Sequence, residues 1–401
     1  MTGQIAEDIA ALDAAYHMAT YKRNDVLFVR GEGMHLYDAG GREYLDFLAG
    51  IGVVNLGHAH PAVTAAVCEQ MGKLVHVSNL FHVEHRAVLA ARLSALADGG
   101  WKAFFCNSGT EAIEGAIKLA RRWGIARRGP ECHTIVAAER AFHGRTLGAL
   151  AATGQASKQA AFEPLPRGFS HVPLNDVAAL DAAVTGGTCA VLLEPIQGEA
   201  GVYPCDLEYL AAVRRLCDER EVLLIFDEVQ TGMFRTGTPF AWQGYGIRPD
   251  VMTLAKGLAN GLPAGAVLAS GSAAEAFLPG DHGSTFGGGP VIAAAALATI
   301  DALESARLGE HATVVGAALR EELSHIASET GLFTDVRGRG LMTGVDLAKP
   351  IARPVGAELL ARGLVVNATG DRTLRFLPPL VCTQHETAIL TDTLQDVIGG
   401  M

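Results

Sequence analysis

The chain of 401 residues is poor in charged and aromatic residues: Asp, Glu, Lys and Arg make up 19% of it, and Phe, Trp and Tyr 6%. The charge that is present is mainly negative, with a net charge of −11 at pH 7. Nucleic acids and anionic membranes attract basic surfaces, so we expect neither as a partner. An anionic small molecule is still compatible, because a few local arginines can dominate the charge of a pocket.

Cysteine is scarce and scattered along the chain. The seven cysteines are odd in number, and no two of them are spaced as Cys-x-x-Cys. We therefore expect no disulfide framework and no structural zinc site, and we predict a reducing, cytoplasmic location. His58 and His60 lack a third ligand at a suitable spacing, so no metal site is predicted.

Long apolar runs are missing as well. No run approaches the ~18 residues that a membrane-spanning helix requires, so we expect no membrane span. Glu7 and Asp8 precede any basic residue, which is not the pattern of a secretory signal. Apolar residues in total are nevertheless abundant, at 49% of the chain, and can build a large core.

From residue 101 onward, strand-like apolar segments alternate with segments of helical periodicity. Strands are predicted at residues 102–106, 134–138, 189–194 and 223–227, and helices at residues 110–123 and 207–220. This alternation is typical of βαβ units. It predicts an α/β fold with a mostly parallel sheet that is covered by helices on both faces.

The length allows two or three domains. We predict an N-terminal segment over residues 1–60, a large α/β domain over residues 61–290 and an α+β domain over residues 291–401, with the first and last segments forming the smaller domain. The N-terminal segment combines a helix with hairpin strands. Ile9, Leu12 and Tyr16 share one face of that helix, which predicts that it packs on another element.

The segment around residues 223–232 carries the main functional signal. Its apolar run predicts a buried parallel strand that ends at Asp227, and ligands of open α/β sheets bind at the carboxyl ends of strands. Lys256 follows another short apolar segment. A carboxylate and an amine at two strand ends suit a pyridoxal-phosphate site, in which the carboxylate keeps the ring nitrogen protonated and the amine holds the aldehyde as a Schiff base. An edge aspartate and a surface lysine would account for these two residues equally well.

Other residues at predicted strand ends suit the same kind of ligand. The turn at Ser108, Gly109 and Thr110 leads into a helix, where it could hold a phosphate or simply cap the helix. Phe142 could stack on a planar ring or belong to the core, and Arg145 could bind a carboxylate. Considered individually, the charged residues Glu199 and Arg375 would be assigned to the surface.

In combination, these segments resemble class III (fold type I) pyridoxal-phosphate aminotransferases, and most closely the N-acetylornithine aminotransferase group. The resemblance covers nearly the whole chain. It is carried by Tyr44-Leu45-Asp46-Phe47, Asn55-Leu56-Gly57-His58-Ala59-His60-Pro61, Asn107-Ser108-Gly109-Thr110-Glu111-Ala112, Phe142-His143-Gly144-Arg145-Thr146, Glu194-Pro195-Ile196-Gln197-Gly198-Glu199, Asp227-Glu228-Val229-Gln230-Thr231-Gly232, Ala255-Lys256-Gly257 and Ser284-Thr285-Phe286-Gly287-Gly288.

The resemblance implies a role for each cofactor-site residue. Lys256 would be the Schiff-base lysine and the proton shuttle, and Asp227 would pair with the pyridine nitrogen. Thr285 would complete the phosphate site of the neighbouring subunit, which implies a homodimer. The remaining cofactor contacts would come from Ser108, Gly109 and Thr110 at the phosphate, Phe142 on the ring face, Gln230 at the phenolic oxygen, and Glu228 and Val229 beside them.

The resemblance also implies two substrates, N-acetylornithine and 2-oxoglutarate, which would meet Arg145, Ser284 and Arg375. N-acetylornithine reacts at its terminal amine, so its carboxylate would lie far from the ring, at Arg145. The 2-oxoglutarate reacts beside a carboxylate and would need Arg375 near the ring. Glu199 would neutralise Arg375 while the donor is bound, because an unpaired buried charge is costly, and would swing away for the dicarboxylate.

Three positions depart from the family pattern. Phe234 and Gly289 stand where glycine and asparagine are usual, and Ile51 replaces the tyrosine of ornithine-specific relatives. The last difference favours an acylated donor over free ornithine. The alternatives are another ω-aminotransferase, acting on N-succinylornithine, succinyldiaminopimelate, ornithine or 4-aminobutyrate, and an aminomutase on the same fold.

Overall fold

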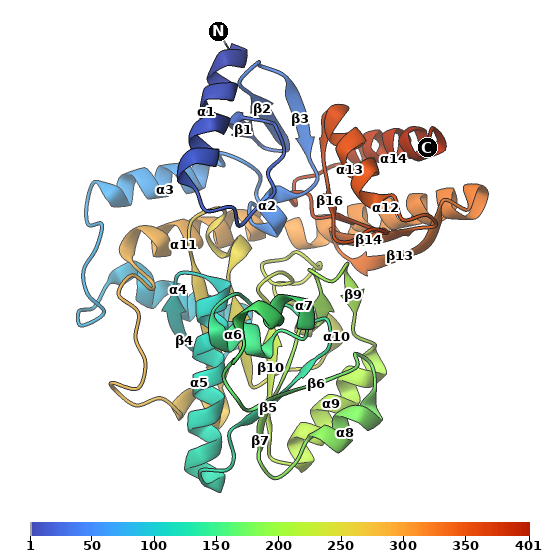
Figure 1. The fold of residues 1–401 in the computed structure, drawn as a ribbon. Helices are drawn as coiled ribbons and strands as arrows, with labels where there is room; N and C mark the ends of the chain where they lie inside the picture. Colours follow the sequence, from blue (N-terminus) through green and yellow to red (C-terminus); the bar gives the residue numbers. More distant parts are fainter. Residues whose placement is uncertain (1) are drawn as a thin grey trace.

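A computed structural model describes residues 2–401 (Figure 1). Its centre is a seven-stranded sheet in the order β4-β12-β11-β10-β7-β5-β6. Only β12 runs antiparallel to its neighbours, so the predicted mostly parallel sheet is confirmed. The strands are β4 (Trp101–Cys106), β5 (Thr134–Ala138), β6 (Phe169–Val172), β7 (Thr188–Leu193), β10 (Leu223–Asp227), β11 (Val251–Leu254) and β12 (Gly265–Ser270).

Both faces of this sheet are buried. Successive side chains of a strand point to opposite faces, so Leu224 and Phe226 belong to one apolar cluster while Leu223 and Ile225 belong to another. Helix α9 (Leu207–Glu219) contributes to the first cluster, and α5 (Gly109–Arg128) to the second. A strand buried on both faces needs apolar residues at every position, which accounts for the continuous apolar run before Asp227.

Shorter elements surround the sheet and connect its strands. The helices are α3 (Pro61–Met71), α4 (Glu84–Leu96), α6 (Leu147–Ala152), α7 (Ala156–Gln159), η1 (Ala160–Phe162), α8 (Val177–Ala183), α10 (Ala241–Tyr245), η2 (Lys256–Ala259), η3 (Gly271–Glu275) and α11 (Pro290–Ser305). A separate two-stranded sheet is formed by β8 (Ile196–Gln197) and β9 (Tyr203–Pro204).

Two small sheets lie outside the central sheet, and the first of them joins strands from the N-terminal and C-terminal parts of the chain (Figure 1). The first contains β1 (Phe28–Glu32), β2 (His35–Asp38), β3 (Glu43–Asp46) and β15 (Leu364–Val365), and β15 pairs in parallel with β3. The second contains β13 (Phe333–Arg339), β14 (Met342–Leu347), β16 (Asn367–Ala368) and β17 (Thr373–Phe376), accompanied by α12 (Leu308–Thr330), α13 (Ala352–Ala361) and α14 (Gln384–Gly399). The domain boundaries near residues 60 and 290 stay a prediction.

The N-terminal helix forms, but it does not pack as expected. Helix α1 (Thr2–Tyr16) leaves Ile9, Leu12 and Tyr16 exposed by 45%, 53% and 83%. Within the described chain, therefore, the predicted packing of this apolar face is not found. The short helix α2 (Ala49–Gly52) follows the first small sheet. None of the helices in residues 2–401 combines the length and apolar character needed to cross a bilayer.

Candidate active site

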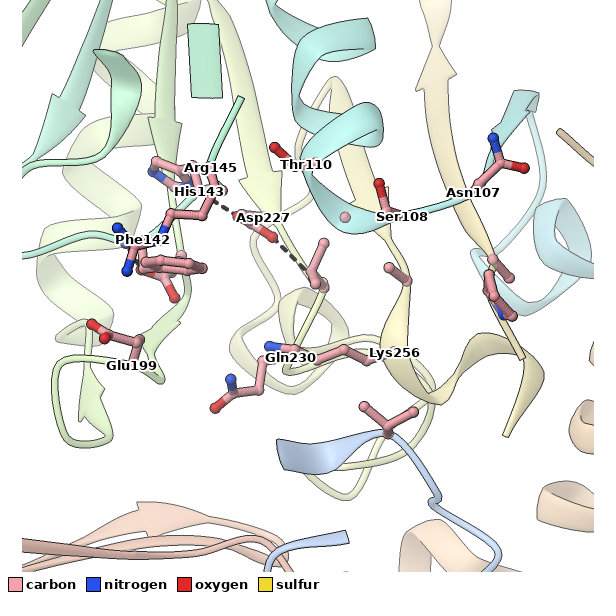
Figure 2. A pocket seen from close by; sticks show the side chains of 18 of the residues that line it. Asn107, Ser108, Thr110, Phe142, His143, Arg145, Glu199, Asp227, Gln230 and Lys256 are labelled. Atoms are coloured by element: carbon pink, nitrogen blue, oxygen red, sulfur yellow. Dashed lines mark hydrogen bonds and ion pairs between the residues drawn. The ribbon is translucent and has the colours of Figure 1, made fainter. Parts of the chain in front are cut away.

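The carboxyl ends of several parallel strands meet at one edge of the central sheet. Strands β5, β7, β10 and β11 are parallel to one another, and β4 runs in the same direction because it is antiparallel to β12, which is antiparallel to β11. Ser108, Phe142, Glu194, Asp227 and Lys256 lie at or just after these strand ends. They line one cavity of about 430 Å³, as expected for a ligand site of an α/β sheet (Figure 2).

Asp227 is held rigidly at the inner wall of this cavity. Its side chain is buried, and its Oδ1 accepts hydrogen bonds from the Val229 N–H at 3.0 Å and the Thr253 hydroxyl at 3.2 Å. Its Oδ2 lies 2.8 Å from His143 Nδ1. Because three neighbours fix both oxygens, the carboxylate presents a defined negative charge to the cavity.

His143 has no assigned role in the sequence interpretation, although it follows Phe142 directly. Its side chain is buried against Asp227, and its Nε2 has no hydrogen-bond partner within residues 2–401. The contact of His143 Nδ1 with Asp227 Oδ2 fixes the orientation of that carboxylate. The only sequence signal for it was its place beside Phe142 in the motif.

Lys256 enters the same cavity from the loop after β11. Its backbone has a φ of 43°, in the left-handed region, which turns the chain sharply from the strand into η2. Burial, assisted by the positive charge of Arg375, lowers the pKa of the Lys256 amine to about 8. At neutral pH a useful fraction of this amine is therefore uncharged and nucleophilic.

This shift predicts the pH dependence of Lys256 labelling. The uncharged amine reacts and the ammonium does not, so lowering the pKa moves the rise in reactivity to lower pH. In protein freed of cofactor, we expect trace acetylation of Lys256, followed by mass spectrometry between pH 6 and 11, to rise with a midpoint near 8. Exposed Lys102 in the same sample serves as the internal reference. A Lys256 midpoint above about 10, near the ordinary lysine value, would contradict burial as the cause.

The start of α5 forms a seat for an anion at the cavity wall. Ser108 is the N-cap, and its hydroxyl accepts from the Glu111 N–H at 3.3 Å. The following N–H groups have no acceptor inside the helix and lie at the positive end of its dipole. A Cβ at Gly109 would lie 2.9 Å from Val229 Cγ1, and one at Gly144 would lie 2.3 Å from Thr110 Oγ1. Because neither glycine has a side chain, the backbone at Gly109 can pack closely against Val229 and the backbone at Gly144 against Thr110, beside this seat.

Phe142 and Gln230 complete the cavity walls. The buried carboxylate of Glu194 accepts from the Phe142 N–H at 2.9 Å and from the Gly198 N–H at 3.2 Å, which fixes the loop that carries the ring. Burial raises the pKa of Glu194 to about 7. The side-chain oxygen of Gln230 is buried and has no hydrogen-bond partner among residues 2–401.

The side chain of Glu228 makes its contacts away from the cavity, and its place among the cofactor residues stays a prediction. Its carboxylate accepts from the N–H groups of Ala241 at 3.0 Å and Trp242 at 2.8 Å, and from the Thr231 hydroxyl. These contacts place the side chain at the start of α10, outside the cavity. We assign Glu228 a structural role there, whereas its neighbour Val229 does line the cavity.

Ser284 and Thr285 do not line the 430 Å³ cavity. They border a second cavity of about 290 Å³, where Ser284 Oγ accepts from the Asn107 side chain at 3.3 Å and from the Gly287 N–H at 3.0 Å. Thr285 is exposed. Neither side chain reaches the anion seat of its own chain, so their predicted roles require another subunit.

Arg375 and Glu199 are close in space but not directly paired. Arg375 is buried in β17 and donates to the Gly198 carbonyl at 2.8 Å and to Asn367 Oδ1 at 2.7 Å. Glu199 instead binds Lys158 and Gln155, so the predicted ion pair with Arg375 is not found within residues 2–401. Arg145 is exposed at the cavity rim, 5.6 Å from the centre of the Phe142 ring.

The three departures from the family pattern lie outside the cavity lining. Phe234 is buried with a φ of 66°, and its ring lies against Gly309 at the start of α12. Gly289 caps α11, and Ile51 is 42% exposed. None of them contributes a side chain to the 430 Å³ cavity.

Comparisons with known proteins agree with this geometry. A model of the class-III aminotransferases matches residues 17–398. The chain is 45% identical over 386 residues to the acetylornithine aminotransferase of Methanocaldococcus jannaschii and 49% identical over 385 residues to that of Gloeobacter violaceus, with 96% of each chain covered in both cases. The crystal structure of ornithine aminotransferase from Toxoplasma gondii superposes with a TM-score of 0.94 at 32% identity, over 98% of this chain and 95% of that one. The chain belongs to the class-III aminotransferase family, whose cofactor is pyridoxal 5′-phosphate.

Proposed function

We propose that the protein transfers the δ-amino group of N2-acetyl-L-ornithine to 2-oxoglutarate, giving N-acetylglutamate 5-semialdehyde and glutamate, a step of arginine biosynthesis. The observation that carries the chemistry is the Lys256 amine, with a pKa of about 8, sharing one cavity with the fixed carboxylate of Asp227. The donor is supported by relatives named acetylornithine aminotransferase at 45% and 49% identity.

The cavity residues fit pyridoxal 5′-phosphate. A phosphate matches the N-terminus of α5, where Gly109 and Gly144 leave room for close approach. The buried side-chain oxygen of Gln230 and the Nε2 of His143 find no hydrogen-bond partner in residues 2–401, so both are polar positions that a ligand could satisfy. Ser108, Gly109 and Thr110 would hold the phosphate, Phe142 the ring face and Asp227 the ring nitrogen.

When bound, the cofactor withdraws electrons from the carbon that carries the transferred amine. Lys256 would hold the cofactor and, once released from it, would move the proton of the reaction: its uncharged Nζ would accept the proton from the δ-carbon of the donor and, as an ammonium, would donate it to the cofactor, which takes up the amino group. The Asp227 carboxylate, fixed by Val229, Thr253 and His143, would stabilise a positive charge on the ring nitrogen.

Two arginines can distinguish the two substrates. In N-acetylornithine three methylene groups and the α-carbon separate the carboxylate from the reacting amine, which suits Arg145 at the cavity rim. In 2-oxoglutarate a carboxylate adjoins the reacting carbon, which suits Arg375 because its charge already acts on Lys256. Guanidinium groups bind carboxylates in a bidentate manner, so each arginine would also orient its substrate.

We further propose a homodimer located in the cytoplasm. Ser284 and Thr285 lie outside the cavity of their own chain, which supports their use at the site of a neighbouring subunit. All seven cysteines are free thiols, which fits a reducing compartment.

A donor panel tests the proposed function. Purified protein is incubated with pyridoxal phosphate, 2-oxoglutarate and one amine, and the glutamate formed is measured. We expect N-acetylornithine to give the highest kcat/KM, ahead of N-succinylornithine, succinyldiaminopimelate, ornithine and 4-aminobutyrate. Absence of turnover with N-acylornithines would contradict the proposal. Rearrangement of a single substrate without a keto acid would identify an aminomutase.

A further inference from the structure

Glu199 is held by a small cluster beside the cavity. Its Oε1 accepts from Lys158 Nζ at 2.8 Å, and its Oε2 accepts from Gln155 Nε2 at 2.8 Å. Lys158 also donates to the Gln155 side-chain oxygen, so the three side chains are mutually connected. Burial raises the pKa of Glu199, but the hydrogen bonds from Lys158 and Gln155 outweigh it, and the pKa lies below its ordinary value. The cluster therefore stabilises the ionised carboxylate.

Arg375 is the other cation within reach of Glu199. Its guanidinium is buried, its contacts go to uncharged oxygens of Gly198 and Asn367, and its Nε has no hydrogen-bond partner within residues 2–401. Gly198, whose carbonyl accepts from Arg375 at 2.8 Å, directly precedes Glu199 in the chain, so the two charged groups lie near each other. Lys158 and Arg375 thus compete for the carboxylate of Glu199, and in this structure Lys158 binds it.

We propose that Lys158 is a specificity-determining positioning residue, which holds Glu199 away from Arg375 and so leaves Arg375 available to the carboxylate of a 2-oxo acid. The inference rests on the proposed function and deepens it. A residue outside the cavity lining would keep Arg375 free for the second substrate, 2-oxoglutarate. Lys158 need not touch that substrate.

The location of Lys158 makes this competition possible. It lies on α7, with its Nζ 5.7 Å from the centre of the Phe142 ring, and Glu199 lies on the other side of the cavity from Lys256 (Figure 2). The side chains of Lys158 and Glu199 are 20% and 35% exposed, so solvent screens their attraction only in part. A moderate change in this attraction can then shift the population of Glu199 between its two partners.

The first test replaces Lys158 by methionine, which keeps most of the volume and removes the charge. Glu199 then pairs with Arg375, and 2-oxoglutarate must break that pair before it binds. We expect the KM for 2-oxoglutarate to rise about 3- to 10-fold, as the binding-competent fraction falls, while kcat and the KM for N-acetylornithine change by less than about twofold. Lys158→Arg restores the charge and should return the KM for 2-oxoglutarate to the wild-type value.

The second test repeats the substitution in a Glu199→Gln background. A neutral glutamine does not compete for Arg375, so adding Lys158→Met should change the KM for 2-oxoglutarate by less than about twofold. If Lys158 instead attracts the substrate directly, its loss raises that KM equally in both backgrounds. Equal effects, or no effect in the wild-type background, would overturn the inference.

A binding measurement separates this inference from the proposed function. Calorimetric titration of the holoenzyme with glutarate, a dicarboxylate without a keto group, should show the same order of affinities without turnover: wild type and Lys158→Arg tighter than Lys158→Met. If the wild-type enzyme makes no glutamate from 2-oxoglutarate, the proposed function fails and this inference with it. If the wild type is active but binds glutarate no more tightly than Lys158→Met, only the role of Lys158 is wrong.

Discussion

Replacing Lys256 by alanine is expected to lower kcat by about 10⁴-fold, because the substitution removes both the nucleophile that would hold the cofactor and the base that would move the proton. The fold should be kept, since the amine faces the cavity and makes no hydrogen bond within residues 2–401. Single-turnover kinetics with N-acetylornithine measure the loss, and circular dichroism checks the fold.

Two further variants test whether the loss of kcat comes from the Lys256 amine itself. Lys256→Arg keeps a positive charge but cannot act as a base near neutral pH, so it should be almost as inactive as Lys256→Ala. Lys102→Ala removes an exposed lysine that is paired with Glu275 far from the cavity, and it should keep the wild-type kcat. A Lys256→Ala enzyme that kept a tenth of the wild-type kcat would be incompatible with the proposed role.

Replacing Asp227 by asparagine is expected to lower kcat by about 10²- to 10³-fold. Asparagine has nearly the same shape and can keep the contacts with Val229 and Thr253, but it has no negative charge to stabilise a protonated ring nitrogen. The matched control is Asp250→Asn, because Asp250 also adjoins a strand of the central sheet, where it binds Arg214 and the Leu224 N–H. This control should lose stability and keep kcat. Comparable losses of kcat in both variants would assign Asp227 a structural role only.

Much of the fold could be predicted because its strands are buried on both faces. In an α/β chain, a short continuous apolar run such as the one before Asp227 is typical of a central parallel strand. Strand β12 was not predicted, since four of the six residues in Gly265–Ser270 are Gly, Ala or Ser and its antiparallel pairing with β4 and β11 depends on contacts far apart in sequence. The order of the strands in the sheet also depends on contacts between residues far apart in sequence, and such contacts produce no periodic pattern in the sequence.

The candidate site shows a similar division. Asp227, Lys256 and Ser108 could be found because strand ends and helix starts are visible in the sequence, and the structure brings them together in one cavity. The partners of Asp227 and Glu199 could not be found in this way, because His143 and Lys158 meet them only through the fold. The contacts of Glu228 with α10 could not be predicted either, because adjacency to Asp227 does not tell which side of the turn its side chain takes.

The proposed chemistry depends most directly on the bond between Lys256 and the cofactor. Reduction of the holoenzyme with borohydride makes that bond permanent, and peptide mapping by mass spectrometry then locates it. We expect a single pyridoxyl group on the peptide that contains Lys256, absent from the Lys256→Ala variant. A pyridoxyl group on another lysine, such as Lys158, or no modified peptide at all, would contradict the central claim.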